Sequence, residues 1–152
     1  RAADWSTPQL KLLIANRVLS DAQVTDDDLK AANLVLFGTP RTNGVLGRIA
    51  DRLPVKIADH KYEIAGKTYQ GADLGLVLCY PNPLNPERYV LVYAGERHGE
   101  KLSVNHKHDL LPDFVVFTTK RFGRDDTNDA LCAGTFDMDW RLSPALTWEP
   151  KP

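Results

Sequence analysis

Short apolar runs, separated by turns that contain proline or glycine, dominate the hydrophobic pattern of this chain. A run of four to eight apolar residues bounded by turn signals is typical of a strand that is buried on both faces. The pattern predicts four such strands, at residues 33–38, 74–80, 89–93 and 113–118. A fifth strand, at the edge of the sheet, is expected over Cys132–Trp140.

The clearest helical signal follows the first of these strands. Between Thr42 and Leu53 the apolar residues recur at helical spacing, and Pro54 ends the run. Strand, tight turn and helix together make half of a βαβ unit. A shorter helix is expected after Thr25, which is a suitable N-cap, and a small hairpin is expected to turn at Gly66.

Strands with helices between some of them predict an α/β fold. We expect a mixed, mainly parallel sheet flanked by helices, with Rossmann-like or flavodoxin-like layering and added β-hairpins. The length of 152 residues suits a single domain, residues 1–152, with its core at about residues 18–142 and an extended tail at residues 143–152.

The charge balance restricts the partners of the chain. Lysine and arginine number 19 against 20 acidic side chains, which leaves a formal net charge of −1. Such a balance supplies no general attraction to nucleic acid or to an anionic membrane. No apolar stretch reaches the roughly 18 residues that a membrane-spanning helix needs. We therefore expect neither a nucleic-acid partner nor a membrane span.

The motifs of the common enzyme classes are missing from the sequence. It contains no Gly-x-Ser-x-Gly nucleophile elbow, no Walker A motif and no Gly-x-Gly-x-x-Gly loop. It also lacks His-Glu-x-x-His and Cys-x-x-Cys. We accordingly predict no catalytic residue in this chain and no cofactor. Of the two cysteines, Cys79 is expected to be a small buried hydrophobe in a strand, and a disulfide between Cys79 and Cys132 is possible only in an oxidising compartment.

A candidate binding site lies at the turn after the first strand. The N-terminus of a helix attracts anions, and Arg41 adds a positive charge there. With Thr39 and Asn43, and with the more distant Asn82 and Asn85, it forms a candidate ligand site at the carboxyl edge of the sheet. The alternative is that Thr39 or Thr42 caps the helix and that the asparagines fix turns.

Two weaker candidates complete the chemistry. His98, His106, His108 and Asp109 have a spacing that a metal ion or an acid–base pair can use, although the lysines in the same segment favour a solvated loop. The second candidate is the set of three tryptophans, Trp5, Trp140 and Trp148. They either line a sugar-binding face or pin the ends of the chain to the core.

Four motifs together resemble one family. They are Val24-Thr25-Asp26-Asp27-Asp28, Asn33-Leu34-Val35-Leu36-Phe37-Gly38-Thr39-Pro40-x-x-Asn43, Ile49-Ala50-Asp51-x-Leu53-Pro54 and Tyr80-Pro81-Asn82-Pro83-Leu84-Asn85-Pro86-x-x-Tyr89-Val90. From about Val18 to Leu142 the chain resembles the C-terminal region of large bacterial proteins whose preceding part is an α/β-hydrolase of the prolyl-oligopeptidase or esterase type.

The resemblance implies an accessory role. In such parent proteins the catalytic triad lies upstream, in the hydrolase domain, so no catalytic residue is carried over to this chain. The family turn often reads Gly-Asp-Pro where this chain has Gly38-Thr39-Pro40. We expect a non-catalytic accessory or interaction domain of a secreted, periplasmic or cell-envelope serine hydrolase, with the upstream catalytic domain as its partner. The chain begins at Arg1 rather than Met, which also favours a fragment or a processed product. The alternatives are a module that binds carbohydrate or a small anionic ligand, and an independent enzyme or metal-binding protein that uses the histidine segment.

Overall fold

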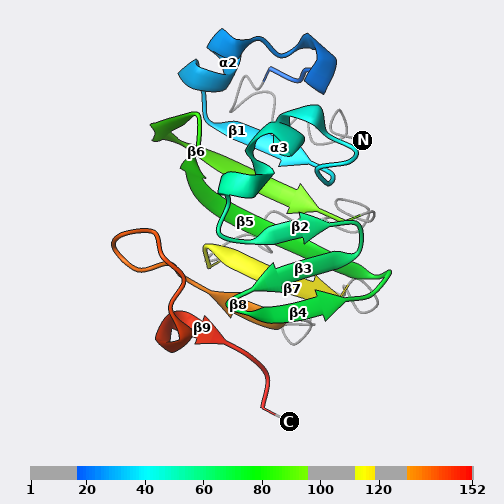
Figure 1. The fold of residues 1–152 in the computed structure, drawn as a ribbon, viewed down its shortest axis with the longest axis vertical. Helices are drawn as coiled ribbons and strands as arrows, with labels where there is room; N and C mark the ends of the chain where they lie inside the picture. Colours follow the sequence, from blue (N-terminus) through cyan, green and yellow to red (C-terminus); the bar gives the residue numbers. More distant parts are fainter. Residues whose placement is uncertain (1–16, 96–111, 119–129, 152) are drawn as a thin grey trace, which may run out of the picture.

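The fold consists of two β-sheets with short helices at one end. The computed structural model describes residues 17–95, 112–118 and 130–151. In this part of the chain, sheet A has six strands in the spatial order β1-β6-β5-β7-β8-β9, and sheet B has three in the order β2-β3-β4. Figure 1 shows α3 and sheet B lying over one face of sheet A.

The elements have the following bounds. The strands of sheet A are β1 (Leu34–Phe37), β5 (Leu74–Asn82), β6 (Asn85–Ala94), β7 (Phe114–Thr118), β8 (Ala130–Gly134) and β9 (Thr147–Trp148). Those of sheet B are β2 (Lys56–Ala58), β3 (Lys61–Ile64) and β4 (Lys67–Gln70). The helices are α2 (Asp26–Ala31) and α3 (Gly44–Ile49), with 3₁₀ turns η2 (Asp21–Gln23), η3 (Ala50–Arg52) and η5 (Pro144–Leu146).

The prediction of a mainly parallel α/β sheet flanked by helices is wrong. Within the described residues only β1 and β6 run parallel, and every other strand pair is antiparallel. The chain does not return from α3 into a neighbouring parallel strand, but continues through η3 into the antiparallel sheet B. The strands predicted at residues 74–80 and 89–93 are the two arms of one antiparallel hairpin, β5–β6, which extends as far as Asn82 and Asn85 and carries a bulge at Pro81 and Asn82.

The physical reason for the error is that sheet A is apolar on both faces. On the face toward sheet B, Leu76, Leu78 and Phe114 are fully buried. On the opposite face Val77, Tyr93, Val115 and Phe117 form a second cluster, and all its described members belong to strands of sheet A. A strand that is apolar on both faces has a continuous apolar run in its sequence. Such runs are typical of parallel sheets, so the sequence pattern predicts parallel strands here.

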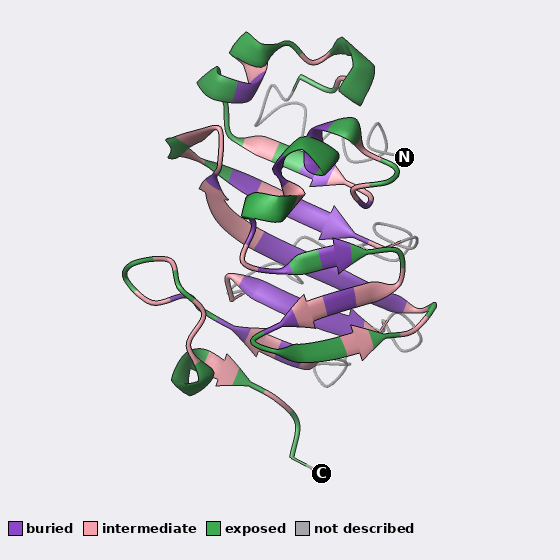
Figure 2. Ribbon diagram, viewed as in Figure 1, coloured by how far each residue is buried: buried purple, intermediate pink, exposed green. Residues whose placement is uncertain are grey.

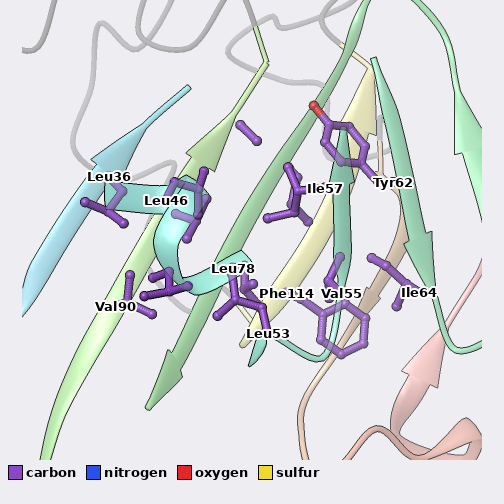
Figure 3. Close-up of a cluster of buried hydrophobic side chains, with 14 of the residues drawn as sticks. Leu36, Leu46, Leu53, Val55, Ile57, Tyr62, Ile64, Leu78, Val90 and Phe114 are labelled. Carbon is purple, nitrogen blue, oxygen red and sulfur yellow. The ribbon is translucent and has the colours of Figure 1, made fainter. Parts of the chain in front are cut away.

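The main core fills the space between the two sheets and α3 (Figure 3), and Figure 2 shows buried positions on α3 and on strands of both sheets. Leu46 and Ile49 of α3 are fully buried in it, which confirms the amphipathic stripe read from the sequence. Tyr62 of sheet B is also fully buried and donates a 3.4 Å hydrogen bond to the carbonyl of Leu74. Burial raises the pKa of Tyr62 to about 12, so this side chain acts as a neutral core residue.

Local turn chemistry agrees with the sequence at two places. Thr25 caps α2, and its hydroxyl accepts a 3.2 Å hydrogen bond from the amide of Asp28. The hairpin between β3 and β4 turns at Ala65 and Gly66, whose φ values are +50° and +81°. Two consecutive positive φ values give a turn that matches the twist of the flanking strands.

The C-terminal region differs from its prediction. The expected strand over Cys132–Trp140 is wrong in its range, because β8 spans Ala130–Gly134 and ends before the loop at residues 137–141. The side chain of Asp137 closes this loop by accepting hydrogen bonds from the amides of Asp139 and Arg141, at 2.9 and 2.8 Å. The tail predicted to be extended forms η5 and then β9, which pairs with β8 at the edge of sheet A.

Candidate functional site

The turn between β1 and α3, where the sequence placed an anion site, is filled by side chains of the chain itself. Gly38 has φ +110° and allows the sharp change of direction. The carboxamide of Asn43 accepts a 3.0 Å hydrogen bond from the amide of Leu46 and donates one of 3.1 Å to the carbonyl of Phe37. The carboxylate of Asp21 accepts a 2.7 Å hydrogen bond from the amide of Gly44. Asn43 and Asp21 therefore occupy the positions that an anion would take at this helix end.

Thr39 and Arg41 meet on a carboxylate that sequence reasoning did not select. The Thr39 hydroxyl donates a 2.6 Å hydrogen bond to Asp59, in the turn between β2 and β3, and the guanidinium of Arg41 binds the other carboxylate oxygen. These two hydrogen bonds are the main reason that the pKa of Asp59 is lowered. Thr39 is buried, whereas the Arg41 side chain is 74% exposed. The cluster joins the end of β1 to sheet B.

Asn82 and Asn85 lie at the other end of the sheet. Phe37 pairs with Tyr93 near the end of β6, whereas Asn85 begins that strand. The eight-residue separation along β6 corresponds to roughly 27 Å at the usual rise of a strand. The structure thus brings Thr39, Arg41 and Asn43 together but places the two asparagines far from them.

Both asparagines hold the C-terminal end of α2. The Asn82 amide donates a 2.9 Å hydrogen bond to the carbonyl of Leu29, and the Asn85 amide donates one of 2.7 Å to the carbonyl of Lys30. Arg88 continues the series with a 3.0 Å hydrogen bond to the carbonyl of Ala31. The last carbonyls of a helix have no hydrogen-bond donors within the helix. These three side chains act as the donors for α2.

A third polar cluster, which the sequence analysis missed, connects the C-terminal strand to sheet B. Glu149 follows β9, and its two carboxylate oxygens bind Lys67 and the hydroxyl of Tyr69, both on β4. These contacts lower the pKa of Glu149. Burial is the first cause of the raised pKa of Tyr69 and of the Cys132 thiol on β8. The partners are about 80 residues apart in sequence, and only the i, i+2 spacing of Lys67 and Tyr69 hints that they share a side of a strand.

Aromatic side chains gather beside the loop that follows β8. The Trp140 ring lies 5.9 Å from that of Tyr80, 5.6 Å from that of Tyr89 and 6.0 Å from that of Phe136. This packing favours the alternative in which Trp140 pins the chain end to the core. Trp148 is 52% exposed on β9, and Trp5 lies outside the described residues.

The remaining candidates are the histidine segment and the two cysteines. His98, His106, His108 and Asp109 lie outside the described residues. Within residues 17–95, 112–118 and 130–151, no three histidine, cysteine or acidic side chains are grouped closely enough to hold a metal ion. Cys79 and Cys132 are both free thiols.

Comparison with known proteins identifies no relative. No family model, no curated protein and no solved structure matches the chain. Across the described part of the chain, no helix has the length and apolar character needed to cross a membrane.

Proposed function

We propose that this chain is a non-catalytic accessory domain that packs on, or orients, a partner domain. The observation that carries the proposal is that all five candidate side chains form hydrogen bonds or ion pairs with other groups of the chain itself. Thr39 and Arg41 hold Asp59, Asn43 caps α3, and Asn82 and Asn85 cap α2. Polar side chains committed to turns and helix ends in this way serve as scaffold.

Exposed apolar side chains in the C-terminal part of the chain support an interaction role. Met138 is 97% exposed at the loop after β8, and Leu146 and Trp148 are 43% and 52% exposed near β9. Leu146 and Trp148 are only two residues apart in the sequence, and neighbouring exposed apolar side chains mark interaction sites more often than scattered ones do. We infer that a partner contacts this segment.

The partner we propose is an α/β-hydrolase domain of the same polypeptide, in a secreted, periplasmic or cell-envelope protein. This part of the proposal rests on the resemblance of the four sequence motifs to regions that follow such hydrolases. In that arrangement the serine, the acid and the histidine of the triad belong to the partner, and this chain contributes surface and orientation.

The test has a catalytic arm and a binding arm. The purified chain is assayed on chromogenic esters and peptides, and we expect no turnover. The hydrolase domain encoded upstream in the same reading frame is then titrated with the chain. We expect saturable binding that Met138→Asp and Trp148→Asp each weaken about tenfold or more, because each places a charge in an apolar contact. Val18→Asp is the matched control, since Val18 is 49% exposed at a distant position in the sequence.

Three results would contradict the proposal. They are turnover by the purified chain, a reading frame without a hydrolase domain, and binding that none of the C-terminal substitutions weakens. Thermal-shift assays with polysaccharides and phosphorylated metabolites test the alternative of a ligand-binding module. A stabilising shift that Arg41→Ala abolishes would favour that alternative, with the ligand at the turn after β1.

A further inference from the structure

The loop at residues 137–141, between β8 and η5, carries the most exposed large apolar side chain of the described residues. Met138 is 97% exposed, although Phe136, two residues earlier, is buried in the main core. In the view of Figure 1 this loop, drawn in orange, projects beyond the edges of both sheets. The backbone around Met138 explains why its side chain stays in solvent.

Hydrogen bonds close the backbone of the loop on both sides of Met138. The amide of Asp137 donates to the carbonyl of Arg141, and the carbonyl of Asp137 accepts from the amide of Trp140, both at 3.0 Å. One carboxylate oxygen of Asp137 accepts from the amides of Asp139 and Arg141, at 2.9 and 2.8 Å. A single residue, Asp137, therefore sets the conformation from which Met138 projects.

The loop is also tied to the core at both ends. The amide of Phe136 donates a 2.9 Å hydrogen bond to the carboxylate of Asp113. Trp140 has a φ of +60°, which is rare for a bulky residue, and its carbonyl accepts a 3.3 Å hydrogen bond from the hydroxyl of Tyr80. A non-glycine residue keeps such a conformation only where its surroundings enforce it. The loop is thus held in one conformation before any partner binds.

We propose that the loop at residues 137–141 is the docking element for the partner domain, and that Met138 enters an apolar pocket on that domain. This inference rests on the proposed accessory function and names the contact through which it acts. A side chain that is already held in its bound position costs less ordering on association. Tyr89 is 47% exposed and its ring lies 5.6 Å from that of Trp140, so it adds aromatic surface beside the loop.

The charges of the loop favour a protein partner over a membrane surface. Asp137, Asp139 and Arg141 give the loop a formal net charge of −1. An anionic lipid surface attracts basic segments and repels acidic ones. Asp139 and Arg141 form a 3.6 Å ion pair, and their side chains are 69% and 76% exposed, so both can meet a polar rim around the pocket. The flexible thioether of methionine suits an irregular apolar pocket on a protein.

The test measures binding of the full chain to the hydrolase domain encoded upstream in the same reading frame, by isothermal titration calorimetry. We expect Met138→Ala to weaken binding about tenfold, and its nearly full exposure means that the variant should fold. Asp137→Ala should weaken binding about fivefold although it keeps Met138, because the loop loses two hydrogen bonds. Asp137→Asn should bind within about twofold of the parent, since its carboxamide oxygen can accept both.

A double substitution shows whether Asp137 acts through Met138. In the Met138→Ala background, Asp137→Ala should weaken binding by less than about twofold further, because no side chain is left for it to position. Asp21→Ala is the matched control. The carboxylate of Asp21 also accepts a backbone hydrogen bond, at 2.7 Å from the amide of Gly44, but it belongs to another element. We expect Asp21→Ala to leave binding within about twofold of the parent.

The results separate this inference from the proposed function. Binding that Trp148→Asp weakens and Met138→Ala leaves unchanged would overturn the docking loop and leave the accessory role standing. An equal loss from Asp137→Ala with and without Met138, or an equal loss from Asp21→Ala, would overturn the positioning role of Asp137. A hydrolase domain that does not bind the chain at all would overturn both proposals.

Discussion

At the scale of single residues, Gly75 illustrates how closely the second face of sheet A is packed. A Cβ atom at this position would lie 2.5 Å from the Cζ atom of Phe117 and 2.9 and 3.0 Å from two further ring atoms. The ring lies directly against the backbone of the neighbouring strand, where Gly75 and Phe117 are paired. Only glycine leaves room for the ring, so the requirement at this position is steric.

We expect Gly75→Ala to lower the free energy of unfolding by about 1–3 kcal/mol, the usual range for an overpacked core. Gly71→Ala is the control. A Cβ atom at Gly71 would have the Cγ atom of Leu74 as its nearest neighbour, at 3.4 Å, which is an ordinary contact. Urea unfolding measures both variants. If Phe117→Leu in the Gly75→Ala background restores none of the lost stability, the steric explanation is wrong.

Asn82 and Asn85 differ in burial although both bind α2. Asn82 is fully buried, and its carboxamide also accepts a 2.9 Å hydrogen bond from the amide of Leu84. Asn82→Ala therefore leaves the buried carbonyl of Leu29 and the part-buried amide of Leu84 without their hydrogen-bond partner, and should cost about 2–3 kcal/mol of stability. Asn85→Ala lets water replace the lost partner and should cost less than about 1 kcal/mol. Equal costs in chemical denaturation would contradict the burial argument.

At the scale of elements, α3 is too short to be stable by itself and depends on its contacts. It has six residues, and isolated helices of this length do not persist in water. Its buried face, with Val45, Leu46 and Ile49, supplies packing, while Asn43 and Asp21 bind its first amides. The capping contacts therefore belong to the same structural unit as the core face.

Removing these caps should destabilise the protein measurably. We expect Asn43→Ala to cost about 1–2 kcal/mol, since it loses both the cap and the hydrogen bond to the carbonyl of Phe37. Asp21→Ala should cost about 0.5–1 kcal/mol, because its contact with the amide of Gly44 is exposed. Thermal unfolding followed by circular dichroism gives both values. A larger loss for Asp21→Ala than for Asn43→Ala would show that the order is wrong.

The elements differ in how far the sequence determines them. The positions of β1, β5, β6, β7 and the Ala65–Gly66 hairpin follow from local patterns, because apolar runs and turn residues act over a few positions. The direction of each strand does not, since an apolar run has the same pattern in a parallel and an antiparallel sheet. The contact of Thr39 and Arg41 with Asp59 and the Glu149 cluster depend on pairing between sheets, so no spacing in the sequence reveals them.

At the scale of the whole molecule, two carboxylates join sheet B to the rest of the fold at separate places. Asp59 binds Thr39 and Arg41 at the end of β1, and Glu149 binds Lys67 and Tyr69 on β4. These contacts hold the pKa of Asp59 below its ordinary value of 3.8 and that of Glu149 below 4.5, and His60 adds a smaller lowering at Asp59. Both links require the ionised form, so acid should weaken them together.

The direction of the pH dependence follows from linkage. A carboxylate whose pKa is lower in the folded state than in the unfolded state contributes its full stabilisation above the unfolded value, and loses it as the pH falls through the folded value. Stability should therefore be constant near neutral pH and decline from about pH 5 downward. Asp59→Asn combined with Glu149→Gln should start from a lower stability at pH 7 and decline less steeply in acid. Urea unfolding at a series of pH values measures both curves. Curves that stay parallel into acid would mean that neither carboxylate carries the dependence, and that the two sheets are held together by their apolar core alone.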